Sequence, residues 1–478
     1  MSQSSIKKNT YFVFLGQFVQ MALAFFLMFF AARYLGDAGF GKYALASTIM
    51  YFVLLGNDLG INIYTTREVA RNLDHAQHYF KKALGVKLLI IPADLFVLFL
   101  FLYVSPYEKN TKMAIILFAI YGILQSVVQL ITSIFRAYQR MQYETIIIIT
   151  EKILTTSLGV FILLQGWGLL PFCAVFILGG SVSFFLSRFF LKRKFFAPKI
   201  SLGLSHAKTL LWISIPFGLS MIIANIYNNV GTLILSWFES AQIVGWYSSA
   251  FRLVNFTNVI PTVLSIALFP ALSVEITRSA SKFRELYSRG FKYLFYVALP
   301  MVVGTILLAD KIVLLVFGEE FVHSIPVLKI MIIGGGLIFF NTYFAWFFNA
   351  TNHQKNLVYI LIAALFINLF LNFILVLEFS YIGASIATVL TELIIFAICY
   401  IYIRKKVVKM QEWSFVYRSF LSAVLMAGFL IIFPSLQVLV AIGIASIIYL
   451  LSLYGLRGFT LEEILLFKNQ RKEVVVEE

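Results

Sequence analysis

A permanently charged side chain lies inside a long apolar run of this sequence. Arg252 stands in IVGWYSSAFRLVNFTNVI (243–260), with no acidic residue within one helical turn of it. Its guanidinium offers a planar fork of donors that matches phosphate or carboxylate groups. A charge in an apolar, membrane-like run is costly, so Arg252 is a candidate binding residue. The structural alternative is that Arg252 pairs with a carboxylate of another helix.

Three carboxylates in similar runs are candidates for a proton or cation site, or for a charge that lines a cavity. They are Asp58 in LLGNDLGIN, Asp94 two residues after a proline, and Glu392 in the middle of its run. Asp58 could equally cap a helix break between Gly56 and Gly60, and Asp94 could equally be a structural partner. The sequence therefore predicts functional roles for these carboxylates without excluding structural ones.

Two further groups have the same double interpretation. Glu151 and Lys152 are adjacent, and neighbouring helix positions point about 100° apart, so we do not expect them to neutralise each other. Either is a candidate cavity residue. Asn225, Asn228 and Asn229 form an amide cluster in another run. Amides bind sugar hydroxyls, but they also join transmembrane helices.

The composition identifies the solvent that these residues meet. Of 478 residues, 61% are hydrophobic and 13% are charged, whereas soluble domains carry roughly 25% charged residues. Continuous apolar runs of about 20 residues recur along the chain, each long enough to cross a bilayer as a helix. We therefore predict an all-α polytopic membrane protein with fourteen spans. The spans lie near 10–32, 41–63, 84–104, 113–135, 143–164, 167–190, 211–236, 243–270, 291–309, 326–348, 357–377, 381–403, 414–433 and 436–456.

The basic residues predict the orientation of these spans. Thirty of the 38 Lys and Arg residues, Lys87 counted among them, fall on alternate connections that include both termini, and five fall on the opposite side. Cytoplasmic loops carry the excess of basic residues, so we expect both termini on the cytoplasmic side of the membrane. The net charge of +16 is spread over eight separate segments, which argues against nucleic-acid binding. The connection over 65–83 should form an amphipathic surface helix.

Signatures of enzymes and cofactors are missing from the sequence. Cys173 and Cys399 both lie in apolar runs and imply neither a disulfide framework nor a metal site. We find no phosphate-binding glycine-lysine motif, nucleophile elbow or zinc-protease motif. We therefore expect no cofactor, no metal and no enzymatic activity.

An internal repeat divides the chain. GKYALA (41–46) matches GWYSSA (245–250) at an offset of 204, and EVAR (68–71) matches EITR (275–278) at an offset of 207. Six spans per repeat give two lobes that run in the same direction, related by a pseudo-two-fold axis along the membrane normal. We expect lobes at 1–199 and 200–408, two extra helices within 409–457, and a cytoplasmic tail at 458–478. Arg252 corresponds to Thr48 in the first repeat, so its charge is on one lobe only.

Several of these stretches resemble one known family. They are AARYLGDAGFGKYALASTIMYFVLLGNDLGINIYTTREVAR (31–71), SIPFGLSMIIANIYNNVGTLILSWF (214–238), GWYSSAFRLVNF (245–256), ALFPALS (267–273) and VFGEEFVHSIPVLKI (316–330). Together they resemble the polysaccharide transporter family. This is the flippase branch of the multidrug/oligosaccharidyl-lipid/polysaccharide exporter superfamily, which also contains the multidrug and toxin extrusion antiporters.

The resemblance implies a function. Members move polyprenyl-diphosphate-linked oligosaccharides across the cytoplasmic membrane by alternating access of two lobes around a central cationic cavity. Arg252 would then face that cavity and contact the diphosphate, and Arg136 would meet the incoming substrate or be an ordinary cytoplasmic arginine. Membrane lipids, a polysaccharide polymerase and glycosyltransferases are the implied partners. Two alternatives remain: a cation-coupled drug antiporter, and a membrane glycan polymerase or glycosyltransferase, which the short outer loops disfavour.

Overall fold

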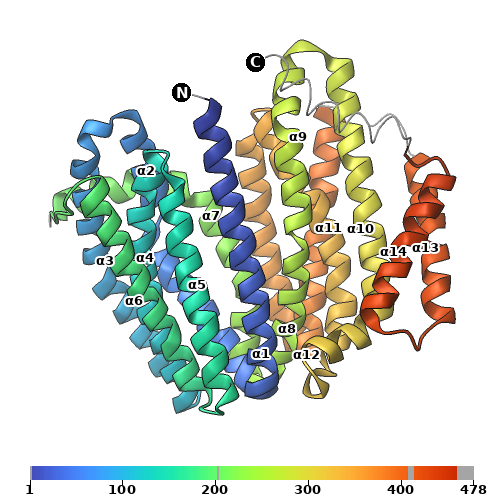
Figure 1. Ribbon diagram of the computed structural model, residues 1–478, viewed down its shortest axis with the longest axis horizontal. Helices are drawn as coiled ribbons and strands as arrows, with labels where there is room; N and C mark the ends of the chain where they lie inside the picture. Colours follow the sequence, from blue (N-terminus) through green and yellow to red (C-terminus); the bar gives the residue numbers. More distant parts are fainter. Residues whose placement is uncertain (1–2, 202–203, 407–413, 460–478) are drawn as a thin grey trace. The chain divides into compact units, whose positions relative to one another are not determined.

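The computed structural model describes residues 3–201, 204–406 and 414–459, and within these ranges every regular element is a helix. Figure 1 traces the chain through them. The helices are α1 (Gln3–Asp58), α2 (Ile61–Arg71), η1 (Leu73–His75), α3 (Ala76–Val104), α4 (Lys109–Ala137), α5 (Met141–Leu164), α6 (Leu169–Lys194), α7 (Leu204–Phe238), α8 (Ala241–Thr257), α9 (Val259–Arg278), α10 (Ala280–Val316), η2 (Glu319–Phe321), α11 (Ser324–Ala350), α12 (Gln354–Lys406), α13 (Ser414–Ile432) and α14 (Val438–Gly455). A helix satisfies all its backbone hydrogen bonds internally, which is why apolar runs in lipid adopt it.

Eleven helical segments in the described part of the chain are long and apolar enough to cross a membrane. Two of them are bent. α1 has a non-helical residue at Gly36 (φ 69°, ψ 180°), and α12 has one at Ser380 (φ 51°, ψ −133°). Each bend falls between two spans that the sequence predicts as separate, so the expected pairs lie on bent helices.

Two sequence-based expectations need correction. The span expected over 243–270 is interrupted, because α8 ends at Thr257 and α9 begins at Val259. The surface helix expected over 65–83 is shorter and begins earlier, as α2 covers Ile61–Arg71 and the chain from Ala76 already belongs to α3. Hydropathy alone misses the α8–α9 boundary because a turn within apolar sequence leaves its average unchanged. The α2–α3 boundary lies in the polar stretch 71–75, where hydropathy does not distinguish a turn from the polar face of a surface helix.

The helices form two compact units. Unit 1 comprises residues 1–249 and 365–384, and unit 2 comprises residues 250–364 and 385–478. Packing therefore places α7 and the start of α8 with the first unit, whereas the repeat predicts lobes that divide near residue 200. The lobe boundaries remain a prediction, and residues 460–478 of the predicted tail lie outside the described residues.

In unit 1, α1 packs on α4 and α5, α4 packs on α6, and α7 packs on α1, α2 and α3. Two glycines bring the backbones of α1 and α8 close together. A Cβ on Gly41 would lie 1.7 Å from the carbonyl oxygen of Ala241, and one on Gly245 would lie 2.1 Å from that of Asp37. The offset of 204 that relates the repeats exchanges these two contacts, because it turns residue 41 into 245 and residue 37 into 241.

In unit 2, α9 and α10 pack on α11, and the C-terminal pair α13 and α14 packs on α10. Tyr287 of α10 and Tyr343 of α11 are almost fully buried, and the Tyr343 hydroxyl donates to the backbone oxygen of Tyr287 at 3.1 Å. Lys311 of α10 donates to the backbone oxygens of Pro434 and Leu436 in the connection between α13 and α14. Polar as well as apolar contacts thus hold the two C-terminal helices against α10 within unit 2.

Candidate functional site

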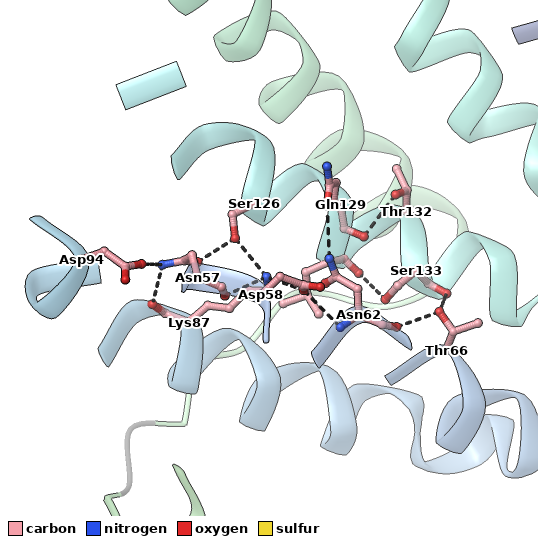
Figure 2. A network of polar contacts seen from close by, with 11 residues as sticks. Asn57, Asp58, Asn62, Thr66, Lys87, Asp94, Ser126, Gln129, Thr132 and Ser133 are labelled. Atoms are coloured by element: carbon pink, nitrogen blue, oxygen red, sulfur yellow. Dashed lines mark hydrogen bonds and ion pairs between the residues drawn. The ribbon is translucent and has the colours of Figure 1, made fainter. Parts of the chain in front are cut away.

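A buried ion pair lies in unit 1 where α1 ends, as Figure 2 shows. Lys87 of α3 is 0% exposed, and its Nζ lies 3.0 Å from Oδ1 of Asp58. The same ammonium donates to the Ser126 hydroxyl at 2.9 Å and to the backbone oxygen of Asn57 at 3.1 Å. An ammonium has three donors, so these three acceptors satisfy it completely. A buried charge persists only when it is paired and hydrogen-bonded in this way.

Asn57 extends the network to a second carboxylate. Its Nδ2 donates to Oδ2 of Asp94 at 3.2 Å, and its Oδ1 accepts from the Ser126 hydroxyl at 2.6 Å. One ammonium and two carboxylates therefore share a hydrogen-bonded network that spans α1, α3 and α4 (Figure 2). With all three ionised the network carries one excess negative charge, so it can take up one proton or one cation without a second counter-charge.

The ion pair lies beside the joint between α1 and α2. Leu59 and Gly60 both have left-handed backbones (φ 42° and 84°), and Asp58 Oδ1 accepts the Asn62 backbone N–H at 3.2 Å. A Cβ on Gly60 would lie 2.4 Å from the backbone oxygen of Ser214 in α7. Asp58 therefore pairs with Lys87 and also accepts a hydrogen bond from the first turn of the helix that follows the break. The proton or cation site expected at Asp58 stays a prediction. A change in its charge acts where α1, α2 and α7 meet.

Glu151 of α5 lies in a second buried cluster of unit 1. It is 4% exposed and accepts from the Tyr121 hydroxyl (2.6 Å), the Gln125 amide (2.8 Å) and the Ser183 hydroxyl (2.7 Å). Lys152 Nζ also lies 3.3 Å from Glu151 Oε1. The expectation that these neighbours would not neutralise each other is wrong, because the long lysine side chain reaches back across the helix surface. This cluster joins α4, α5 and α6.

The remaining candidates of unit 1 have simpler surroundings. Arg136, at the end of α4, makes a two-pronged contact with Glu144, with Nε 3.1 and 2.9 Å from the two carboxylate oxygens. Asn225, Asn228 and Asn229 each donate to the backbone oxygen four residues earlier in α7. These amide hydrogens bond within their own helix rather than to a neighbouring one.

Unit 2 contains the other two candidates. Arg252 of α8 is partly buried. Glu392 of α12 is 4% exposed, and Asn341 of α11 donates to its Oε2 at 2.7 Å and to its backbone oxygen at 3.0 Å. Glu392 is therefore a deep carboxylate with an amide partner. Among the described residues, no group of three or more His, Cys, Asp or Glu side chains could hold a metal ion.

Comparison with known proteins identifies the family. The family model described as "Polysaccharide biosynthesis protein" matches residues 6–276, which is more than half of the chain. The chain belongs to the polysaccharide biosynthesis protein family. A second model, MatE, matches residues 216–374.

Two relatives of this family member cover most of its length. It is 24% identical over 460 residues to the "Probable low-salt glycan biosynthesis flippase Agl15" of Haloferax volcanii, covering 94% of this chain and 92% of that protein. It is 23% identical over 355 residues to the "Putative O-antigen transporter" of Shigella flexneri, covering 70% and 82%. The family is one of membrane transporters rather than enzymes, as the sequence predicts.

The fold agrees with that of a solved flippase. The structure of the lipid II flippase MurJ in an inward closed conformation matches 93% of this family member and 98% of its own chain, with a TM-score of 0.78 and 15% identity. At that identity the match establishes the fold alone. The protein is thus a multi-pass, all-α membrane protein with a MurJ-like fold.

Sequence reasoning missed Lys87 in this family member. The charge distribution assigns this residue to a cytoplasmic connection, whereas the structure buries it completely against Asp58. One signal could have revealed it: Lys87 lies three residues inside the span predicted over 84–104. Asn57 and Ser126, which complete the network, are uncharged. Hydropathy does not distinguish them from polar residues that only hold transmembrane helices together.

Proposed function

We propose that this protein is a flippase that moves a polyprenyl-diphosphate-linked oligosaccharide from the cytoplasmic to the outer leaflet for surface polysaccharide biosynthesis. The observation that carries the proposal is the similarity to a named glycan-biosynthesis flippase over 94% of the chain. The match to the polysaccharide biosynthesis family over residues 6–276 supports the same class of substrate. Glycosyltransferases would act before the flippase, and a polysaccharide polymerase would act after it.

The proposed topology has fourteen spans and two cytoplasmic termini. Of the eleven candidate helices, the bent helices α1 and α12 would each supply two spans. The α8–α9 segment would supply the last span. The contacts of Gly41 with Ala241 and of Gly245 with Asp37 support a pseudo-two-fold axis between repeats, since residues near such an axis meet their own equivalents. The excess of basic residues on alternate connections supports the orientation.

The proposed transport mechanism is alternating access around a cationic cavity. Arg252, Arg136, Lys152 and the amides of α7 are the proposed substrate-binding residues. Asp58, Asp94, Glu151 and Glu392 are the proposed charges for ion coupling or for lining the cavity. Of these, the Asp58 and Asp94 network is best suited to coupling, because its one excess negative charge lies beside the joint of α1, α2 and α7.

A drug/cation antiporter is the second candidate, and the MatE match over residues 216–374 favours it. A glycan polymerase or glycosyltransferase is a weaker third candidate, since the relatives are named as transporters.

Reconstitution tests the proposal directly. Purified protein in liposomes should move the head group of a fluorescent polyprenyl-diphosphate oligosaccharide to the opposite leaflet, and protein-free liposomes should not. Lipid extracted from cells with an intact surface glycan supplies the native substrate. Absence of movement with every native lipid-linked glycan, together with proton-driven efflux of a cationic dye, would favour the antiporter instead.

A further inference from the structure

Unit 1 has a cavity beside the start of the second segment of α1 (37–58), which follows the bend at Gly36 and ends at the buried ion pair. The cavity of about 340 Å³ is lined by Lys42, Asn110, Trp167, Leu169, Leu170 and Pro171. Lys42 and Asp58 are 16 residues apart along α1, which is about 24 Å at 1.5 Å per residue. Small-molecule sites occupy roughly 300–1,000 Å³, so this one suits a single small unit such as one sugar ring.

The chain holds Trp167 at the rim of this cavity by a tight turn. The residue lies between Gly166 and Gly168, whose φ angles of 69° and 81° are left-handed. The indole is 58% exposed, and its ring meets Phe161 edge-on with the centroids 5.9 Å apart. The turn and Phe161 thus fix a large aromatic ring while leaving more than half of it accessible. An aromatic face of this kind packs on the C–H face of a sugar ring.

Lys42 gives the cavity a positive wall. Its side chain is 19% exposed, and its Nζ lies 2.6 Å from Oε2 of Glu108, whose side chain is 74% exposed. The hydrogen bond from Lys42 holds the pKa of Glu108 below its usual value. Because Glu108 is well solvated, an acidic group of a ligand can replace it at Lys42 at small cost. Lys109 and Lys112, in the first turn of α4, add further positive charge.

We propose that this cavity binds one acidic sugar unit, with its ring on Trp167 and its carboxylate or phosphate at Lys42. Asn110 supplies an amide for a ring hydroxyl. The inference rests on the proposed function and orientation, which put the cavity at the extracytoplasmic end, where the glycan arrives after transport. Anchoring of Trp167 in the membrane interface is the competing role. An anchoring role requires only the exposed indole, and it explains neither the cavity nor the place of Lys42 in its wall.

Saccharide binding to the full chain in lipid nanodiscs tests this inference. The probes are a tetrasaccharide of alternating glucuronate and N-acetylglucosamine, and neutral cellotetraose, with Kd measured by calorimetry. Trp167→Ala should weaken binding of the acidic probe about tenfold or more, and Trp167→Phe should keep it within about threefold. Lys42→Ala should remove the preference for the acidic over the neutral probe. Trp212→Ala, at an indole of α7 that is 73% exposed, is the matched control and should leave Kd unchanged.

Other outcomes overturn the inference. They are an unchanged Kd for Trp167→Ala, no binding of either probe to the wild-type chain, or a Trp167→Ala effect on membrane retention alone. The assay needs no transport, so the two proposals fail separately. Binding through Trp167 without flipping refutes the proposed function and leaves the cavity assigned. Normal flipping with an unchanged Kd for Trp167→Ala refutes only the cavity.

Discussion

Removing Asp58 should destabilise the protein more than removing Lys87, and removing both should restore much of the loss. Asp58→Asn leaves the Lys87 ammonium 0% exposed without its hydrogen-bonded counter-charge. Breaking a buried pair in this way costs about 3–5 kcal/mol. Lys87→Met removes the buried charge itself and leaves Asp58, whose side chain is 19% exposed and still accepts the Asn62 N–H. We expect that variant to lose about 1–3 kcal/mol.

The double variant tests whether the pair is the cause. Asp58→Asn with Lys87→Met replaces the buried ammonium and its partly exposed partner by an apolar side chain and an amide, and replacing such an ion pair is often neutral or stabilising. It should be more stable than Asp58→Asn alone, with a coupling free energy of about 2–3 kcal/mol. Unfolding of purified protein, followed by intrinsic tryptophan fluorescence in one detergent, gives all four free energies of unfolding.

A second ion pair provides the control. Lys329 and Asp310 lie 2.9 Å apart with side chains 40% and 58% exposed, so Asp310→Asn should cost no more than about 1 kcal/mol. If the losses for Asp58→Asn and Lys87→Met simply add within about 0.5 kcal/mol, the two side chains do not act as a pair and the reasoning is refuted.

Three further experiments test other parts of the molecule. Arg252→Ala should reduce flipping more than about tenfold while the amount of protein in the membrane stays unchanged. Arg252→Lys should recover little of that activity, because an ammonium lacks the planar pair of donors of a guanidinium. Normal flipping by Arg252→Ala would remove the residue from the site. Gly41→Ala should lower the free energy of unfolding by about 3 kcal/mol or more, because its Cβ would lie 1.7 Å from a backbone oxygen. The control Gly443→Ala, whose Cβ would meet nothing within 4 Å, should be neutral or slightly stabilising. Equal melting temperatures of the two variants would contradict the close approach. Asp94→Asn keeps an acceptor for the Asn57 amide but removes the charge, so flipping should lose its dependence on a proton or sodium gradient in liposomes. An unaltered dependence would exclude the Asp58 and Asp94 network from coupling.

Much of the architecture follows from sequence because hydropathy reports the environment of each residue. The apolar runs predict the spans, and the bends at Gly36 and Ser380 fall where the sequence separates neighbouring spans. The repeat predicts that residues 41 and 245 are equivalent, and the structure brings both into one close contact. Each of these signals is local or is a comparison of one stretch with another.

The partners of the charged residues come only from the tertiary structure. Asp58 and Lys87 are 29 residues apart, and nothing in either neighbourhood specifies that their side chains meet. Glu151 has only the adjacent Lys152 as a charged neighbour in sequence, yet Tyr121 and Ser183, 30 and 32 residues away, also satisfy it. Composition and periodicity indicate which charges lie in apolar runs, because hydropathy reports the average polarity of a run. Which group compensates that charge depends on how separate helices pack, so the ion pair beside the α1–α2 joint appears only in the folded chain.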